Sequence, residues 1–238
     1  MKITYIHHSA FAVVGDKKVF IFDYFLGELP QFDENAQIYA FASHKHPDHF
    51  SLDLFHSLEK YNHVTYFLAN EIRLNEKYLE RKGINPAVKS RMIPVKRHMR
   101  TNHNDIVVET LESTDTGVAF IVEWDGNTIY HAGDLNWWHW NMGTEEENER
   151  MGLRYREEID RLKGRHFDAA FVPVDPRLED AYDYGIRYFM EQTDTANVFP
   201  MHFWRDYGIL DKLVQSERNS FFADRVKAIC GEGDTWEI

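Results

Sequence analysis

The sequence predicts an α/β fold in which helices cover mixed β-sheets. Two hairpin turns, at 15–18 and 125–126, separate short apolar runs that are typical of antiparallel strands. Between these hairpins, strand-like and helix-like segments alternate, as they do in layered α/β proteins. Hydrophobic residues make up 43% of the 238 residues and aromatic residues 15%, which is enough for a large core. We therefore expect one domain that spans residues 1–238.

The first part of the chain is predicted to begin with antiparallel strands and to continue with alternating strands and helices. The expected strands are 2–6, 11–14, 19–23, 37–42 and 64–69. Ser51 can cap a helix that runs to Lys60, and Asn70 can cap a second helix that ends at Gly83. These two helices are the first of the predicted outer helices.

The second part of the chain is predicted to add more strands and a long helix. The expected strands are 106–111, 117–124, 127–131, 168–174, 197–200 and one near Trp236. Thr144 and Glu147 form a capping box that begins a helix to about Lys163, and further helices are expected at 178–192 and within 206–227. The segment of about 136–164 is an insertion that is either a lid over a site or a simple outer helix.

Charge and composition exclude several classes of function. With 39 acidic and 27 basic side chains the formal charge is −12, which argues against a nucleic-acid or anionic membrane partner. A small-molecule substrate is expected instead. There is no signal-peptide pattern and no run of about 18 apolar residues, and the single cysteine, Cys230, cannot form an intrachain disulfide. We expect a cytoplasmic protein, and the sequence leaves its oligomeric state open.

The loop 43–50 (Ser-His-Lys-His-Pro-Asp-His-Phe) directly follows the apolar run 37–42 and is the centre of the predicted chemistry. Its candidate metal ligands are His44, His46, Asp48 and His49. Pro47 lacks a backbone donor and disfavours helix at the preceding residue, so the ligands are expected on a rigid loop at a strand end. Imidazole and carboxylate ligands suit zinc and its first-row neighbours. The spacing predicts two ions, one held by the first two histidines and one by the Asp-His pair.

The motif His-x-His-x-Asp-His after an apolar strand resembles the signature of the metallo-β-lactamase superfamily of hydrolases. The segment 130–134 (Tyr-His-Ala-Gly-Asp) is similar to the family's segment with a bridging aspartate, here Asp134. The segment 200–202 is similar to the one with the last metal-binding histidine, here His202. This resemblance implies a four-layer αββα sandwich with two mixed β-sheets and outer helices.

The resemblance also implies a mechanism, in which a hydroxide formed on the metals attacks the substrate. His44 and His46 would hold one ion, while Asp48, His49 and His202 would hold the other. Two Zn²⁺ ions are the expected cofactors, with Mn²⁺ or Fe²⁺ as alternatives, and Asp48 is the expected catalytic residue that orients the water or protonates the leaving group. The chain looks most similar to the lactonase-like branch that includes ascorbate 6-phosphate lactonase. A small ester, lactone or phosphoester is therefore the expected substrate.

One departure from the family pattern affects the first metal. The family has a further histidine before the strand 117–124, where this chain has Ser-Thr-Asp-Thr at 113–116. Asp115 could replace it as an oxygen ligand, which would favour manganese or iron. His8, His131 or His139 could also supply the ligand, or the site could stay weak. The alternative function is a non-hydrolytic metal- or ligand-binding protein with an incomplete first site, and a redox role that uses iron is a third interpretation.

Three further features have two interpretations each. Asp23, at a strand end, either supports a metal ligand or forms a local turn, and His8 either joins the site or is a buried structural histidine. The aromatic cluster Trp137, Trp138 and His139 either stacks on a flat substrate or fills the core. Five basic residues between 89 and 100 either bind a phosphate or carboxylate or form a solvated surface.

Overall fold

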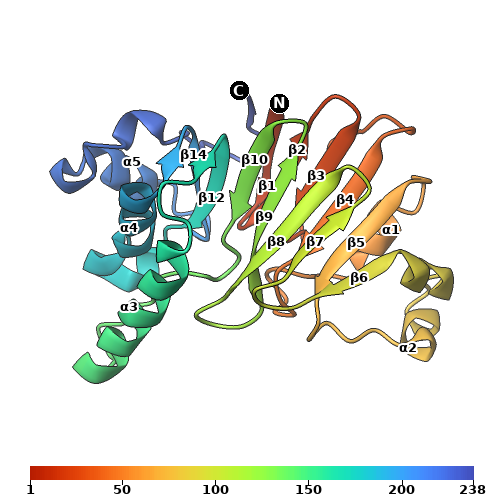
Figure 1. The fold of residues 1–238 in the computed structure, drawn as a ribbon, viewed down its shortest axis with the longest axis horizontal. Coiled ribbons are helices and arrows are strands. Elements are labelled where there is room, and N and C mark those ends of the chain that lie inside the picture. Colours follow the sequence, from red (N-terminus) through yellow and green to blue (C-terminus); the bar gives the residue numbers. More distant parts are fainter. The chain divides into compact units, whose positions relative to one another are not determined.

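The computed structural model describes residues 1–238 and divides into two compact units. Unit 1 comprises Met1–Lys96 and Gly231–Ile238, and unit 2 comprises Arg97–Cys230. Each unit contains one large mixed β-sheet with helices (Figure 1). The predicted α/β class with two mixed sheets and helices is therefore confirmed. The expected single domain with a lid insertion stays a prediction.

The sheet of unit 1 has seven strands in the order β15-β1-β2-β3-β4-β5-β6. They are β1 (Lys2–His7), β2 (Ala10–Val14), β3 (Lys18–Phe22), β4 (Gln37–Ala42), β5 (Val64–Ala69), β6 (Met92–Val95) and β15 (Thr235–Glu237). Pairing is antiparallel from β15 to β3 and parallel from β3 to β6. Strand β3 is buried along its whole length, which explains why its sequence is apolar on both faces.

The helices of unit 1 are shorter than the sequence suggests. They are α1 (Asp53–Ser57), α2 (Glu76–Arg81) and the 3₁₀ segment η1 (Pro86–Arg91). The caps differ in part from those predicted: the N-cap residue of α1 is Leu52, although the Ser51 hydroxyl accepts the Asp53 N–H at 3.1 Å, and α2 is capped by Asn75, whose side chain accepts from the Tyr78 N–H. Asn70 does not begin a helix, and its N–H donates to the carbonyl of Val95, which prolongs the pairing of β5 with β6.

The sheet of unit 2 has six strands in the order β14-β12-β10-β9-β8-β7. They are β7 (Arg100–His103), β8 (Ile106–Glu112), β9 (Val118–Trp124), β10 (Asn127–His131), β12 (Ala169–Pro173) and β14 (Val198–Met201), and β11 (His166–Phe167) pairs separately with β13 (Asp194–Thr195). Pairing is antiparallel from β7 to β10 and parallel from β10 to β14. The predicted turn between β9 and β10 is confirmed. Asp125 and Gly126 both have positive φ, as a two-residue type I′ hairpin requires.

The helices of unit 2 include the predicted long one. They are α3 (Glu145–Asp160), α4 (Tyr184–Gln192), α5 (Gly208–Gln215) and the 3₁₀ segments η2 (Pro176–Ala181), η3 (Glu217–Asn219) and η4 (Ala223–Arg225). The capping box of Thr144 and Glu147 is present at the start of α3. In place of the single helix predicted at 178–192, the structure has η2, whose backbone is interrupted at Glu179 (φ 52°), and the separate helix α4. None of these helices has the length and apolar character needed to cross a membrane.

In each sheet, the parallel strands bring polar side chains to the edge where their carboxyl ends lie. In unit 1, Asp23 follows β3 and the loop 43–50 follows the neighbouring β4. In unit 2, Asp134 comes shortly after β10, Asp175 after β12 and His202 after β14. Parallel neighbours end at the same edge, which is where open α/β sheets bind their ligands. Each unit therefore presents one group of candidate ligands.

Candidate metal centre

The loop after β4 gathers three imidazoles in unit 1. The ring centroids of His44 and His46 are 4.6 Å apart, and those of His44 and His49 are 4.2 Å apart. His44 and His49 are buried and His46 is half-buried. The Nδ1 atom of His44 hydrogen-bonds to the Ser43 hydroxyl at 3.0 Å. A hydrogen bond to Nδ1 fixes the ring so that Nε2 is the nitrogen available to a metal.

Asp23 supports this loop from the end of β3. One of its carboxylate oxygens accepts the Ser43 N–H at 2.7 Å, and the other contacts both the Ser43 hydroxyl and His49 Nδ1 at 2.7 Å. Asp23 is fully buried and has φ 44°, an unfavourable backbone conformation that persists only where its surroundings hold it. The carboxylate therefore orients His49, as the supporting interpretation of Asp23 expects.

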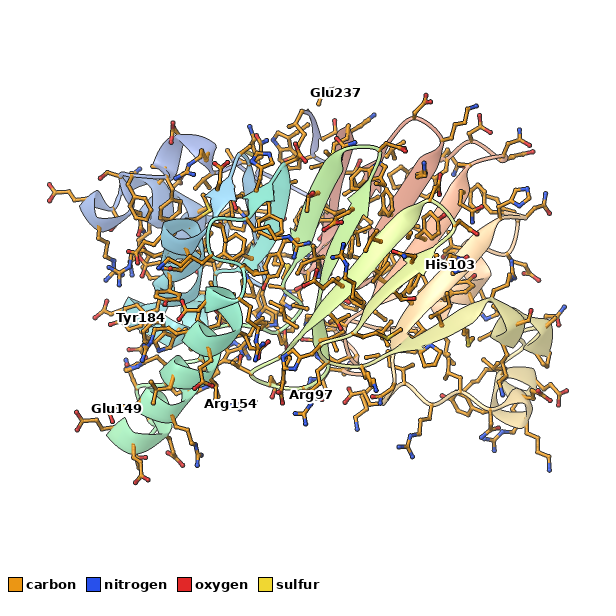
Figure 2. All side chains as sticks on the ribbon, viewed as in Figure 1. Arg97, His103, Glu149, Arg154, Tyr184 and Glu237 are labelled. Carbon is orange, nitrogen blue, oxygen red and sulfur yellow. The ribbon has the colours of Figure 1, made fainter.

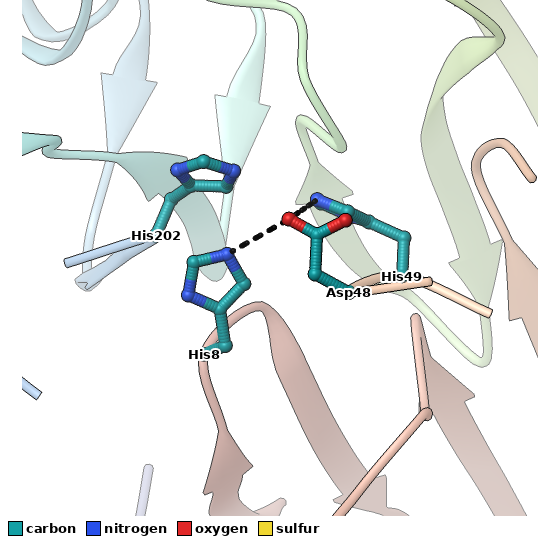
Figure 3. A group of neighbouring side chains, drawn as sticks. All are labelled: His8, Asp48, His49 and His202. Carbon is teal, nitrogen blue, oxygen red and sulfur yellow. Dashed lines mark ion pairs between the residues drawn. The ribbon is translucent and has the colours of Figure 1, made fainter. Parts of the chain in front are cut away.

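His8 and Asp48 lie beside His49 in unit 1. His8 Nε2 is 3.7 Å from a carboxylate oxygen of Asp48, and His49 Nε2 is 3.9 Å from the same oxygen (Figure 3). The three side chains each offer a ligand atom, and these atoms lie within 4.8 Å of one another. His8 is 1% exposed and has φ 54°. Asp48 is more accessible than His8 and His49.

In unit 2, Asp134 and His202 lie next to each other. His202 Nε2 is 3.4 Å from Asp134 Oδ1, and both side chains are buried. His202 Nδ1 hydrogen-bonds to Asp175 at 3.0 Å, and Asp175 is also paired with the Arg177 guanidinium. Burial raises the pKa of Asp175, but the hydrogen bonds with His202 and Arg177 lower it by more. The pKa of Asp175 is therefore below its usual value. Asp175 therefore stays ionised and orients His202 as Asp23 orients His49.

Asp115 lies on the loop between β8 and β9 and is exposed. Its carboxylate offers an oxygen within 4.8 Å of an oxygen of Asp134. The Thr114 hydroxyl joins the two loops, since it donates to the carbonyl of Asn136 at 2.7 Å and accepts the Asn136 N–H at 3.0 Å. The loop that lacks the expected histidine therefore still brings an oxygen donor to the candidate bridging aspartate.

Helix α3 holds the backbone of the Asp115 loop. The Arg154 guanidinium donates to the carbonyls of Ser113 and Thr114, at 3.3 and 3.1 Å. Figure 2 shows Arg154 on the side of α3 that faces the strands of its own unit. Glu158, one helical turn further on, accepts the Glu112 N–H at 3.0 Å. The insertion thus contacts a candidate ligand loop directly.

The remaining predicted site residues have identified surroundings. His131 is fully buried at the end of β10, and its Nδ1 accepts the Gly133 N–H at 3.1 Å, which supports the turn before Asp134. Trp138 lies against His202, with ring centroids 5.5 Å apart. Trp137 and His139 instead lie against Tyr184, at 5.6 and 5.5 Å. Trp138 therefore contacts a candidate metal ligand, whereas the residues on either side of it contact Tyr184.

The donor set fits a divalent first-row metal. His44, His49 and His202 each make a hydrogen bond through Nδ1 to an oxygen of the protein. Such a partner fixes the ring orientation of a metal-binding histidine and increases its basicity. Each unit also offers a carboxylate, Asp48 in unit 1 and Asp134 in unit 2, and mixed nitrogen and oxygen ligands suit zinc, iron or manganese. Asp175, which sequence reasoning missed, has the same signal as Asp23: it is an acid directly after a buried strand.

Comparison with known families identifies the class of protein. A family model described as "Beta-lactamase superfamily domain" matches residues 2–147, which is more than half of the chain. The chain belongs to this superfamily, and it has the metallo-β-lactamase fold. A search of curated proteins finds no match. The lactonase-like branch suggested by the sequence stays a prediction.

Solved structures share the fold over most or all of the chain. A metallo hydrolase, Igni18, from Ignicoccus hospitalis KIN4/I is 19% identical with a TM-score of 0.60, over 100% of this chain and 98% of that one. The metallo-β-lactamase fold protein YhfI from Bacillus subtilis is 13% identical with a TM-score of 0.62, over 99% and 98%. CmlA, a diiron β-hydroxylase from Streptomyces venezuelae, is 12% identical with a TM-score of 0.54, over 84% of this chain and 44% of that one. The fold therefore occurs with more than one chemistry.

Proposed function

We propose that this chain is a metal-dependent hydrolase that binds two divalent cations. In this proposal His44, His46 and Asp115 hold one ion, and Asp48, His49 and His202 hold the other. Asp134 would supply a ligand to both ions, and His8 is an alternative donor. The proposal depends mainly on one observation: histidines in both units are held through Nδ1 by fully buried aspartates, Asp23 and Asp175. Buried acid–histidine pairs of this kind are typical of metal sites.

The side chains have separate roles in the proposed reaction. When bound, the two ions would acidify a water molecule and polarise the substrate oxygen. Asp23 and Asp175 keep the imidazoles of His49 and His202 oriented and in the tautomer that leaves Nε2 for the metal. Asp48 lies between His8 and His49 and is partly exposed, so its carboxylate can orient the water and then carry a proton to the leaving group.

The identity of the metal is part of the proposal. We propose zinc, because the set is rich in imidazole. The oxygen of Asp115 in place of a histidine makes manganese or iron the alternatives. CmlA is a diiron protein with the same fold, which supports keeping iron among them.

The proposed substrate is a small ester, lactone or phosphoester. The formal charge of −12 disfavours a nucleic acid, and the family fold is compatible with many substrates. A cytoplasmic location is also part of the proposal.

The test is turnover by protein of defined metal content. The full chain is freed of metal with a chelator, reloaded with Zn²⁺, Mn²⁺ or Fe²⁺, and assayed with an aryl ester, a lactone and a phosphodiester. We expect metal-dependent hydrolysis that is lost in Asp134→Asn and kept in Asp125→Asn, a matched change in the exposed β9–β10 turn. Hydrolysis that is independent of metal, or unchanged in Asp134→Asn, would refute the proposal.

The second candidate is a non-hydrolytic metal-binding protein. The exposed carboxylate of Asp115, at the place of a histidine, is the observation that favours it, because one oxygen donor binds zinc less well than an imidazole. Fewer than one bound ion per chain and no turnover in the same assay would support this second function. Oxidation of a substrate by the iron-loaded protein alone would instead support a redox role.

A further inference from the structure

A cavity outside the candidate ligands lies within unit 2, between the 138–143 stretch and the first half of α3. Its volume is about 350 Å³, within the range of pockets that bind small molecules. Its lining residues are Trp138, Trp140, Gly143, Glu147, Asn148, Arg150, Met151 and Arg154. The space is large enough for a ring system of the size of naphthalene, because an apolar cavity of about 150 Å³ already accepts benzene.

Two indoles form the flat part of the wall. The rings of Trp138 and Trp140 are nearly parallel, with 6° between their planes and 6.0 Å between their centroids. Trp138 is buried, whereas Trp140 is 38% exposed. The backbone of Trp140 is held on both sides by the Asn148 side chain, which accepts its N–H and donates to its carbonyl, each at 2.9 Å. An exposed indole on so fixed a backbone is suited to contact a flat apolar group.

Arg150 gives the cavity a cation. Arg154 is already engaged with the carbonyls of Ser113 and Thr114, and the carboxylate of Glu147 binds Thr144 in the capping box. Arg150 is exposed at the edge of the cavity, and its guanidinium can bind a carboxylate or phosphate with two parallel hydrogen bonds. The cavity therefore combines a flat apolar wall with a guanidinium at its edge, which also interacts with the nearby Glu147 carboxylate.

Trp138 connects this cavity with the candidate metal ligands of its unit. Its ring contacts the His202 imidazole with 5.5 Å between centroids, and its indole N–H donates to the backbone carbonyl of Asp134 at 3.0 Å. A group bound against this indole would thus lie one side chain away from two proposed ligands. We propose that the cavity binds the planar, anionic part of the substrate, so that the substrate class is an aromatic ester or lactone that carries a carboxylate or phosphate.

This inference depends on the proposed function for its substrate, but binding to the cavity can be tested without turnover. The probe is 2-naphthoate, added to the chelator-treated protein. Binding is followed by quenching of tryptophan fluorescence and by calorimetry. We expect binding that is weakened at least fivefold by Trp140→Ala and by Arg150→Gln, and kept by Trp140→Phe. The neutral analogue 2-naphthamide should bind with an affinity that Arg150→Gln does not change.

The control is Arg73→Gln, which removes the same charge from an exposed position in unit 1 and should leave the affinity for 2-naphthoate unchanged. No binding by the wild type, or equal affinity in the wild type, Trp140→Ala and Arg150→Gln, would overturn the inference. Binding with the expected variant pattern but no hydrolysis of any ester would instead contradict the proposed function alone. If the protein hydrolyses small aliphatic esters but does not bind 2-naphthoate, the inference about the cavity is wrong and the proposed function stands.

Discussion

Two buried aspartates perform the same task in the two units. Asp23 and Asp175 are both 0% exposed, and each accepts a hydrogen bond from the Nδ1 atom of a histidine that we propose as a metal ligand. A carboxylate buried without partners would be costly, but Asp23 contacts Ser43 and His49, and Asp175 contacts Arg177 and His202. Their burial is therefore explained by the histidines that they hold.

Replacement of Asp23 tests this support directly. In Asp23→Asn the charge is lost and the hydrogen bond to His49 weakens, so zinc affinity should fall by about 10- to 100-fold, the usual effect of losing such a partner. The measurement is competition for zinc against a chromogenic chelator. Asp16→Asn, in the exposed β2–β3 turn, should match the wild type. An unchanged affinity in Asp23→Asn would show that the aspartate is only a turn residue.

Arg154 is predicted to position Asp115 through the backbone. Arg154→Met keeps much of the side-chain volume but leaves the carbonyls of Ser113 and Thr114 without these donors, which costs about 1–3 kcal/mol for a buried group. We expect one ion to bind at least fivefold more weakly while the other keeps its affinity, with partial rescue by Arg154→Lys. The affinity of each site is measured by titration with Co²⁺, followed by its absorption spectrum. Equal weakening of both ions would contradict the role.

At the scale of elements, the strands explain how the ligands are gathered. β3 and β4 run parallel in one sheet, and β10, β12 and β14 run parallel in the other. Residues that follow these strands must lie at the same edge of their sheet, even when more than 60 positions separate them in the chain, as for Asp134 and His202. Because the strands are parallel, residues that are far apart in the sequence, such as Asp134 and His202, lie next to each other in the fold.

Most strands could be predicted from sequence, because apolar runs bounded by turns are a local signal. The strand predicted at 37–42 is present with the same bounds, and the capping box at Thr144 begins α3. Strand β7 (Arg-Thr-Asn-His) could not be found, because it has no apolar residue and instead pairs through Arg100 with Glu109 of β8. Asp175 was not predicted, although it is an acid shortly after a buried strand, as Asp23 is, and its histidine lies 27 positions later.

The packing of α4 against the stretch after Asp134 gives a stability prediction. A Cβ atom at Gly185 would lie 1.9 Å from the Asn136 side-chain oxygen, so Gly185→Ala forces a shift of a buried residue. We expect a loss of about 1–3 kcal/mol in the free energy of unfolding, measured by urea denaturation. Gly231→Ala, where an added Cβ meets nothing within 4 Å, is the control. A neutral Gly185→Ala would show that this region adjusts freely.

At the scale of the whole molecule, which has a formal charge of −12, some acidic side chains are paired in an ion-pair network. On the sheet of unit 2, Arg100 binds both Glu109 and Glu123, at 2.7 and 3.1 Å, and Arg165 binds the same two carboxylates. Partial burial raises the pKa of Glu123, but the hydrogen bonds and charges of Arg100 and Arg165 lower it more, so its net pKa is below 4.5. The network therefore joins β7, β8 and β9 with the turn before β11.

This network predicts a pH dependence of stability. Because folding lowers the pKa of Glu123, its ionised form stabilises the protein above pH 4.5, and this contribution is lost as the pH falls through the folded-state pKa. Glu123→Gln should be less stable than the wild type at pH 7 by about 0.5–1 kcal/mol, and the difference should shrink below pH 4.5. Urea denaturation at pH 7 and pH 4 measures it. Glu80→Gln, an exposed change on α2, should show no such trend, and a constant difference for Glu123→Gln would contradict the assignment.

The central claim is that this chain binds two ions through the candidate ligands, and metal stoichiometry tests it most directly. Wild-type protein, dialysed against zinc and analysed for its metal content, should hold two ions per chain. His46→Ala from unit 1 and Asp134→Asn from unit 2 should each hold fewer than two, while Asp125→Asn keeps both. Two ions retained by His46→Ala and by Asp134→Asn would contradict the account.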